Sequence, residues 1–427
     1  MRGPTRSGQG MPRADVVVIG AGLSGLSCAA ELAERGARVF LAAKGMATTH
    51  WTHGGLDVAA PAGARTMRDG IATLAGTRNH PYRTLATGAE ASVAAHLART
   101  AAEGLGHTGS LDSPLIPIPT AIGSLRPAAI LPAAQAAVLA SWAGEGLLLV
   151  GFTGYRDAWA PYAARNLGHA DWPGGPSEIR AAEVVLPELE RRHNVAPQIL
   201  ARQFEDDGWR TRALSAIADA IPAGAWRVGL PAVLGLDAHA EVHAAAERAL
   251  GSRVFEIPSL PPSVPGMRLF EALRRRILSA AGRIQIGFDV VDVERTGNSV
   301  AAIHTEAAAR TLRIAADAFV LASGGIGGAG IRAGHDGALT ERVFGLAVSA
   351  PSRELWFSDD PLCPHPLETA GIEVDANLTP AELENVRVIG SALAGMHYLD
   401  ERCGDGVALA SAHRAAVSLA SNRAVAA

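Results

Sequence analysis

The stretch that most constrains the fold of this chain is DVVVIGAGLSGLSCAAELAERGARVFLAA, residues 15–43. It begins with an unbroken apolar run, as does a parallel strand buried on both faces. Gly20, Gly22 and Gly25 follow in GxGxxG spacing, and a helix-period pattern then runs to Gly36 before a second apolar run. In such a unit the glycines allow a tight turn, a phosphate against the backbone and a helix close to the strand. The stretch predicts a doubly wound, Rossmann-like parallel sheet that binds a nucleotide at a helix N-terminus.

The acidic residue that usually holds the ribose of an adenosine is missing from this unit. It normally stands at the end of the second strand, where the alternation of side chains places Ala43, followed by Lys44, the only lysine of the chain. Two explanations remain open. The ligand lacks an adenosine half, as FMN does, or backbone groups hold the ribose of FAD. Lys44 either contacts a phosphate or is an ordinary exposed lysine.

Composition excludes several classes of protein. At 427 residues, with 48% hydrophobic and 19% charged residues, the chain is long enough for two or three globular domains. A net charge of -4 gives no reason to expect nucleic acid or an anionic membrane as partner. Residues 1–11 are polar and predict a flexible extension, and no apolar run approaches the roughly 20 residues of a membrane span.

No metal site is predicted. Cys28, Cys363 and Cys403 lie too far apart in sequence to suggest a zinc or iron–sulfur site in this chain alone. Three cysteines without a pairing pattern fit a reduced, cytoplasmic setting. His239 and His243 are spaced for one helical face, but no third ligand is evident, so a solvated helix face is the preferred interpretation.

Apolar strands alternate with helical patterns through the middle of the chain, at 146–152, 178–186, 226–233 and 252–257. Short β segments follow, and the run ending at Ser323 and Gly324 returns the chain to the first sheet. This layout predicts a discontinuous flavin-binding domain with a β meander, residues 12–110 and 265–427. An α/β cap or partner domain, residues 111–264, is inserted into it.

A last glycine-rich turn precedes the C-terminal helix. Gly390 and Ser391 follow an apolar strand, and GDGV, Gly404 to Val407, opens a long helical pattern. The positive end of this helix could face the pyrimidine edge of a flavin, where negative charge develops on reduction. A plain packing helix is the alternative.

Five motifs then identify a family: HPY at 80–82, GSLRP at 123–127, SLPPSVPGMRL at 259–269, VLASGG at 320–325 and IGSALAG at 389–395. With them the chain, from about Ala14 to the C-terminal helix, resembles the B subunits of anaerobic glycerol-3-phosphate dehydrogenase. One departure is that the family's GGGV reads GDGV here, with Asp405 at the helix start. Acid–glycine at this point is common in flavoproteins of the fumarate reductase class, which keeps FAD open beside FMN.

The resemblance implies a flavoprotein subunit with FMN. It would pass electrons from glycerol 3-phosphate oxidation, through a FAD-bearing catalytic subunit and an iron–sulfur membrane-docking subunit, towards quinone. The subunit would then be cytoplasmic and peripheral to the inner face of the cell membrane through its partners. A stand-alone flavin oxidoreductase and a non-catalytic scaffold are the alternatives.

The resemblance also implies that a Thr/Ser-rich turn ending in Gly-Gly wraps the flavin ring, and Thr52 to Leu56 resemble that turn. A covalent flavin link through His50 or His53 is less favoured than polar loop histidines. No catalytic base is identified; Arg126 and Arg268 are weak candidates for contact with a substrate anion. The expected cofactor-binding residues are Gly20, Gly22, Leu23, Ser24, Gly25, Lys44, Thr52, Gly54, Gly55, Leu56, Ser323, Gly324, Gly390, Ser391, Gly404, Asp405, Gly406 and Val407.

Overall fold

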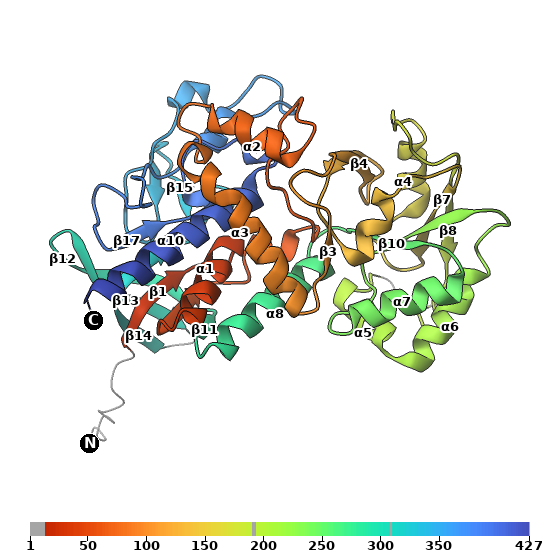
Figure 1. The fold of residues 1–427 in the computed structure, drawn as a ribbon, viewed down its shortest axis with the longest axis horizontal. Helices are drawn as coiled ribbons and strands as arrows, with labels where there is room; N and C mark the ends of the chain where they lie inside the picture. The colour runs from red at the N-terminus through yellow and green to blue at the C-terminus, as the bar shows by residue number, and fades with distance from the viewer. Residues whose placement is uncertain (1–12, 190–193, 308–309, 427) are drawn as a thin grey trace, which may run out of the picture.

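The computed structural model describes residues 13–189, 194–307 and 310–426, so the predicted extension at 1–11 lies outside the described residues. Two sheets organise the chain, and Figure 1 shows their units side by side. The larger sheet has seven strands in the order β11-β2-β1-β14-β13-β12, with β17 also paired to β14. These strands are β1 (Arg13–Ile19), β2 (Val39–Ala43), β11 (Arg283–Ile286), β12 (Asp289–Thr296), β13 (Ser299–Ala307), β14 (Arg310–Leu321) and β17 (Val386–Val388).

Most of the large sheet is parallel. The strands β11, β2, β1 and β14 run parallel to one another, and β17 pairs in parallel with the end of β14. The strands β12, β13 and the first half of β14 form the antiparallel meander. A Rossmann-like sheet with a β meander is therefore confirmed.

Helices cover the large sheet and join it to the rest of the chain. In Figure 1, α1 and α10 lie against each other over the sheet, with α3 beside them. The α-helices of this part are α1 (Leu23–Glu34), α2 (Met67–Ala75), α3 (Tyr82–Ala102), α8 (Val264–Ser279), α9 (Tyr398–Glu401) and α10 (Gly404–Ala426). Its 3-10 helices are η1 (Thr48–Trp51), η3 (Arg353–Leu355), η4 (Pro366–Thr369) and η5 (Gly390–Ala392). A hairpin, β15 (Ile331–Ala333) with β16 (Leu339–Glu341), belongs to the same part.

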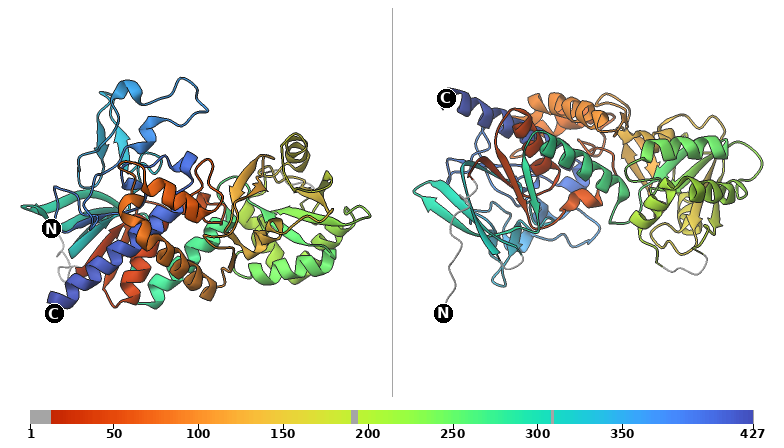
Figure 2. Two further views of the ribbon diagram at one scale, coloured as in Figure 1. Left: turned by 45° about the horizontal axis from the view of Figure 1, so that its top comes forward. Right: turned by 90° about the horizontal axis from the view of Figure 1, so that it is seen from below.

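The second sheet has four parallel strands in the order β10-β9-β7-β8. Its strands and helices, yellow to green in Figures 1 and 2, form a separate unit beside the first. The elements are β7 (Gly146–Phe152), α4 (Ala160–Leu167), β8 (Ile179–Val184), α5 (Pro197–Glu205), α6 (Asp207–Ala218), β9 (Trp226–Pro231), α7 (His239–Leu250) and β10 (Val254–Ile257). Two short antiparallel strand pairs and a 3-10 helix lead into it: β3 (His107–Thr108) with β6 (Leu131–Pro132), β4 (Ile116–Pro119) with β5 (Leu125–Ala128), and η2 (Ala133–Leu139).

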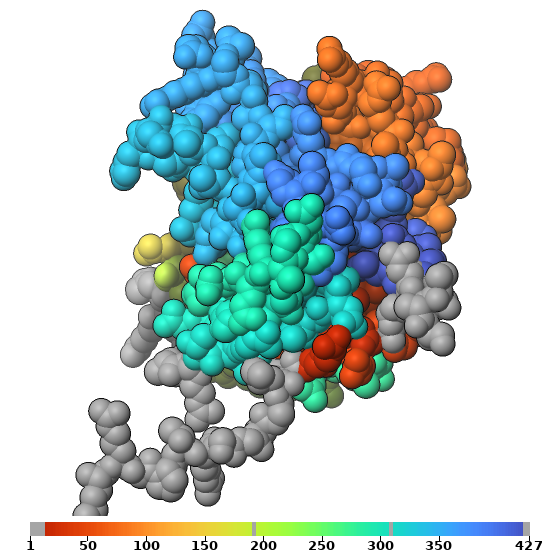
Figure 3. Space-filling view, turned by 90° about the vertical axis from the view of Figure 1, so that its left-hand side faces the viewer, coloured from red at the N-terminus to blue at the C-terminus, as the bar shows by residue number. Residues whose placement is uncertain are grey.

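Residues 146–257, which supply the second sheet, lie between the two groups of strands that build the first. An inserted α/β unit thus agrees with the sequence pattern, while domain boundaries at 111 and 264 stay a prediction. The face of the molecule in Figure 3 belongs to the large-sheet unit: strands of the meander, in turquoise, lie below the light-blue segment that precedes β17.

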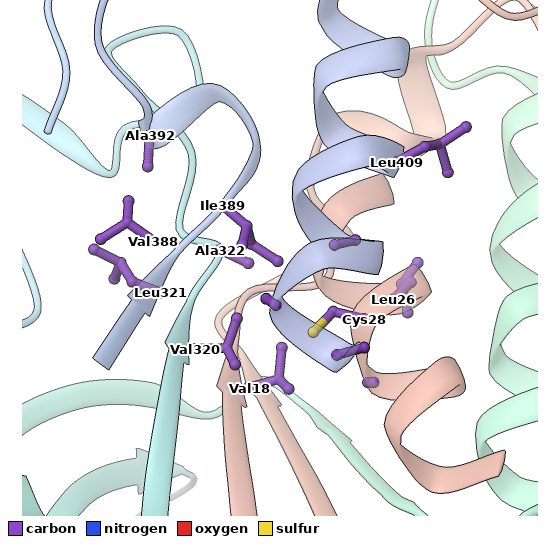
Figure 4. Close-up of a cluster of buried hydrophobic side chains, with 14 of the residues drawn as sticks. Val18, Leu26, Cys28, Val320, Leu321, Ala322, Val388, Ile389, Ala392 and Leu409 are labelled. Atoms are coloured by element: carbon purple, nitrogen blue, oxygen red, sulfur yellow. The ribbon is translucent and has the colours of Figure 1, made fainter. Parts of the chain in front are cut away.

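The core of the large-sheet unit lies where strand ends meet α1 and α10. Val18, Val320 and Leu321 are fully buried, and Leu26 of α1 and Leu409 of α10 belong to the same buried cluster (Figure 4). Strands buried on both faces explain the continuous apolar runs in the sequence. Among the helices of the described residues, none combines the length and the apolarity that crossing a membrane requires.

Candidate flavin site

The turn between β1 and α1 is as tight as its glycines predict. Gly20 has a φ of +117°, and its N–H donates to the Ala42 carbonyl at 2.8 Å. A Cβ at Gly20 would overlap the Ala322 carbonyl, and one at Gly25 would overlap the Gly20 carbonyl. Both glycines are therefore required by close approach within the protein.

Gly22 differs, because space lies open beside it. A Cβ there would meet no heavy atom of the described residues within 4 Å, and its φ of -70° suits any residue. Gly22 is the N-cap of α1 and makes no side-chain capping hydrogen bond. Gly404, at the start of α10, is another glycine at which a Cβ meets no described atom within 4 Å. Open space at these two helix N-termini leaves room for an anionic group.

Segments far apart in sequence meet around the first turn. Gly390 has a φ of +68° and lies so close to Ser24 that a Cβ would overlap the serine hydroxyl. The Gly390 N–H donates to the Ser411 hydroxyl of α10 at 3.0 Å, and the Gly325 N–H donates to the Ser391 hydroxyl at 3.3 Å. The structure thus brings the predicted residues at 20–25, 323–324 and 390–391 together at the carboxyl ends of β1, β14 and β17. Leu23, at the first position of α1, is half-buried there.

Ser323 supplies a further test of whether a ligand fits. Its hydroxyl oxygen is buried and has no hydrogen-bond partner among the described residues. Buried polar groups nearly always have a partner. A polar ligand atom at this place would satisfy the hydroxyl, so the residues present fit a bound flavin nucleotide.

The glycine pair after η1 contacts protein rather than open space. A Cβ at Gly54 would lie 2.7 Å from the Cβ of Pro265, and one at Gly55 would lie 2.8 Å from the Ile130 carbonyl. The Leu56 N–H donates to the same Ile130 carbonyl at 3.1 Å. The backbone around these glycines therefore joins the large-sheet unit to the segment that leads into the second sheet.

Several other polar groups of this turn also have protein partners. The Gly54 N–H donates to the Thr52 hydroxyl at 3.3 Å, while the Thr52 carbonyl accepts from the Ser263 hydroxyl at 2.6 Å. The Gly55 N–H donates to His53 Nδ1 at 3.1 Å. Contact of this turn with the flavin ring stays a prediction, and close packing of protein explains its glycines.

The N-terminus of α10 is bonded to Asp57. The N–H groups of Asp405 and Gly406 donate to the Asp57 carbonyl at 3.0 and 3.2 Å, and the Asp57 N–H donates to Asp405 Oδ2 at 2.9 Å. A Cβ at Gly406 would overlap the Tyr82 hydroxyl, and Val407 is fully buried. Asp405 therefore fastens the helix start to the chain after Leu56.

Charged side chains gather at the same place. Arg126 of β5 forms an ion pair with Asp57, and His53 Nε2 lies 3.5 Å from the other oxygen of that carboxylate. Burial opposes ionisation of Asp57, but the charges and hydrogen bonds of His53 and Arg126 outweigh it and lower the pKa of Asp57. Burial and the neighbouring Asp57 raise the pKa of Asp405 to about 6. The two carboxyl groups thus differ in pKa because their surroundings differ.

Of the two arginines considered for substrate binding, neither is free. Asp57 holds Arg126. Arg268 lies buried in α8, where it donates to both oxygens of Glu256 and twice to the Gly235 carbonyl. A substrate anion at Arg268 would have to displace Glu256 inside the protein. The structure favours a structural ion pair there.

Lys44 has an acidic partner that the sequence does not suggest. Its Nζ lies 2.9 Å from Asp289 Oδ2, and Arg342 approaches the same carboxylate at 3.2 Å. Residues 287 and 288 donate to the Ala43 carbonyl, which brings the start of β12 against the end of β2. A carboxylate therefore does lie near the usual ribose position, although it comes from 245 residues further along the chain and is already paired with two cations.

A second buried cluster lies on the other side of the α10 start. His80 Nε2 is 3.2 Å from Glu401 Oε2, and Cys403 Sγ is 3.5 Å from the same oxygen. The ligand atoms are close enough to hold a metal ion. However, His80 Nδ1 accepts the Tyr82 N–H at 3.1 Å, which assigns the ring proton to Nε2. The imidazole then donates to Glu401 and has no lone pair free for a metal, so the cluster is a hydrogen-bonded one.

The prediction that His243 lies on a solvated face of α7 is wrong. His243 is half-buried and hydrogen-bonded to the Val254 carbonyl at 3.0 Å. His50 packs edge-on against Phe270, with ring centroids 5.1 Å apart.

Comparison with known proteins identifies the family. The model of the FAD-binding domain matches residues 15–407. The B subunit of a probable anaerobic glycerol-3-phosphate dehydrogenase from Halobacterium salinarum is 33% identical over 95% of this chain and 97% of its own length. The B subunit of the Pectobacterium atrosepticum enzyme is 31% identical over 94% of this chain and 97% of its own length. A solved 3-ketosteroid delta1-dehydrogenase from Sterolibacterium denitrificans is 12% identical, with a TM-score of 0.45 over 96% of this chain and all of that one, a likeness too distant to carry an argument.

The family match spans nearly the whole large-sheet unit and the inserted segment together. It agrees with the open, glycine-lined turns at Gly22 and Gly404. This chain belongs to the FAD-binding domain family of flavin-dependent oxidoreductases and, within it, to the B subunits of anaerobic glycerol-3-phosphate dehydrogenase.

Proposed function

We propose that this subunit relays electrons released by the oxidation of glycerol 3-phosphate to dihydroxyacetone phosphate, through its bound flavin, towards iron–sulfur clusters and quinone. The observation that carries the proposal is the pair of open positions at Gly22 and Gly404 in a chain related over nearly its whole length to B subunits. A flavin supplies the ability to take two electrons together and release them singly.

The residues of the chain would bind and orient the flavin. The N-terminus of α1 at Gly22 would receive its phosphate, and the buried Ser323 hydroxyl would gain the polar partner it lacks. The turn at Thr52 to Leu56 is held by hydrogen bonds and close contacts with other parts of the protein. It would exclude water from one edge of the ligand. Residues 12–110 with 265–427 would form the flavin-binding domain, and 111–264 a cap or partner domain.

We propose FMN as the flavin, because Ala43 and Lys44 stand where an acidic residue would hold an adenosine ribose. The nearby Asp289 is already neutralised by Lys44 and Arg342, which weakens it as a ribose ligand. FAD, the ligand in the family's name, is the alternative. Acid extraction of the purified chain followed by chromatography would separate the two.

We propose a FAD-bearing catalytic subunit and an iron–sulfur membrane-docking subunit as partners. The complex would be cytoplasmic and would lie on the inner face of the cell membrane. Because Arg126 and Arg268 are both held by carboxylates, a substrate-oxidising site in this chain alone receives no support from them.

Gly22→Ala tests the site directly. The added methyl group meets only open space in the protein, so thermal stability of the flavin-free chain should stay unchanged while flavin content falls at least tenfold. Gly88→Ala, in α3, also meets no described atom within 4 Å and should keep full flavin content. Flavin content unchanged in Gly22→Ala would contradict the proposed site. Turnover of glycerol 3-phosphate with an artificial dye by the chain alone would contradict the relay.

A further inference from the structure

We propose that Asp57 and Asp405 form a proton-holding pair, which takes up one proton when negative charge arrives beside the start of α10. This inference rests on the proposed flavin site. Asp57 directly follows the predicted ring-wrapping turn that ends at Leu56, and Asp405 lies within the predicted Gly404–Val407 turn. The structure shows that these two segments are bonded to each other.

The two residues are held together by main-chain groups. The Asp57 N–H donates to the Asp405 carboxyl group at 2.9 Å, and the Asp57 carbonyl accepts from the Asp405 N–H at 3.0 Å. This reciprocal pair of bonds joins residues 348 positions apart. If the Asp405 carboxyl group turned away, the Asp57 N–H would lose its acceptor, while the backbone bonds would still hold the start of α10 to Asp57.

The cations near the pair are directed at Asp57 rather than at Asp405. Arg126 forms its ion pair with Asp57, and His53 Nε2 lies 3.5 Å from the other oxygen of the same carboxylate. Asp405 accepts the Asp57 N–H and lies at the positive end of α10. The negative charge of Asp57 opposes ionisation of Asp405, so Asp405 is the member of the pair that holds the proton.

Burial and the charge of Asp57 raise the pKa of Asp405 to about 6, while the pKa of Asp57 is lowered. The pair therefore holds one proton below about pH 6 and releases it above. Added negative charge nearby raises the pKa further, so proton uptake on charging falls in the range that begins near pH 6 and extends upward.

The remaining titratable groups that face Asp405 cannot take this proton's place. The Tyr82 hydroxyl donates to the Val58 carbonyl at 2.6 Å, and burial raises its pKa well above the usual value. Burial likewise raises the pKa of the Cys403 thiol, which donates to Glu401. Both groups stay protonated at neutral pH, so the carboxyl pair is the part of this cluster that titrates.

A bound flavin would bring negative charge to the site when it accepts two electrons from the donor of the complex. One proton would then pass from water to a carboxylate oxygen of the pair, in addition to any proton bound by the flavin itself. No bond to substrate would form or break in this step. The proton would return to water when the flavin gives up the electrons.

The test uses the full flavin-loaded chain and its Asp405→Asn variant, which keeps an oxygen acceptor for the Asp57 N–H but cannot hold the proton. The flavin midpoint potential is measured against pH between pH 5 and 8. Above about pH 6 the wild type should take up ~1 more proton per two electrons than Asp405→Asn. Asp400→Asn removes an exposed carboxylate of neighbouring α9 and should behave as the wild type.

Infrared difference spectra on flavin reduction give a readout that needs no stable variant. A protonated-carboxyl band should grow in the wild type at pH 7 and shift in D2O. The inference is overturned if this band does not change, or if Asp405→Asn binds flavin and shows the wild-type dependence on pH. A wild-type chain that binds no flavin would instead overturn the proposed function.

Discussion

Arg268 and Glu256 form a two-pronged ion pair inside the protein, with Nη1 to Oε2 at 2.6 Å and Nη2 to Oε1 at 2.9 Å. Their side chains are 3% and 0% exposed. The pair joins α8 to β10 and so connects the return to the large sheet with the last strand of the second. Removing one partner leaves a charge buried without compensation.

Arg268→Met should lower the free energy of unfolding by about 3–5 kcal/mol, because Glu256 would lose its cation in a dry site. Urea denaturation measures the change. Arg202→Met is the matched control, since Arg202 lies exposed and 4.0 Å from Asp237; it should cost about 0.5 kcal/mol or less. Equal effects of the two substitutions would argue against a buried ion pair.

Gly25→Ala should destabilise the β1–α1 unit by about 3 kcal/mol or more, because the new methyl group would overlap the Gly20 carbonyl. Gly88→Ala, which adds the same atom to α3 in open space, should stabilise by up to about 1 kcal/mol through helix propensity. Thermal melting of both variants is the measurement. A tolerated Gly25→Ala would mean that α1 does not lie as close to the sheet as described.

Tyr82→Phe should cost about 1–3 kcal/mol, because the buried Val58 carbonyl would lose the hydroxyl that donates to it at 2.6 Å. Tyr162→Phe removes the same atom from a side chain that is 47% exposed, and should change stability by less than about 0.5 kcal/mol. Denaturation in urea compares the two. Similar losses in both would show that the Tyr82 hydroxyl is not a buried donor.

Asp405→Asn should change how stability depends on pH, even without flavin. In the folded state the pKa of Asp405 is raised to about 6, so the folded protein binds this proton more tightly than the unfolded chain. The resulting stabilisation is present at low pH and is lost as pH rises through about 6. Asp405→Asn should therefore match the wild type near pH 4 and exceed its stability by up to about 3 kcal/mol at pH 7.5.

Unfolding curves at several pH values test this expectation, with Asp400→Asn as the exposed control. A constant difference between Asp405→Asn and the wild type across the range would contradict a raised pKa.

Local sequence patterns predicted much of the fold. The apolar run at 146–152 coincides with β7, and the run at 226–233 contains β9. Both strands are parallel and buried, so their signal is continuous over a few residues. The roles of Gly20 and Gly25 were equally predictable, because one short stretch of sequence determines a tight turn between a strand and a helix.

The cluster of Asp57, Arg126 and Asp405 could not be predicted in the same way. Its members come from a loop, a short hairpin and a helix start, and only tertiary packing brings them together. Gly54 and Gly55 resembled a ligand-contacting turn, yet Pro265 and Ile130 approach them in the structure. A glycine signals close approach without identifying what approaches.

The pairing of β1 with β14 has a consequence for synthesis of the chain. Strand β1 ends at Ile19, and its partner begins at Arg310, roughly 290 residues later. At about 5–20 residues per second, translation leaves one edge of an apolar strand uncovered for roughly 15–60 seconds. Ribosome-associated chaperones should therefore bind the nascent chain until β14 emerges, and slower translation should lengthen that exposure.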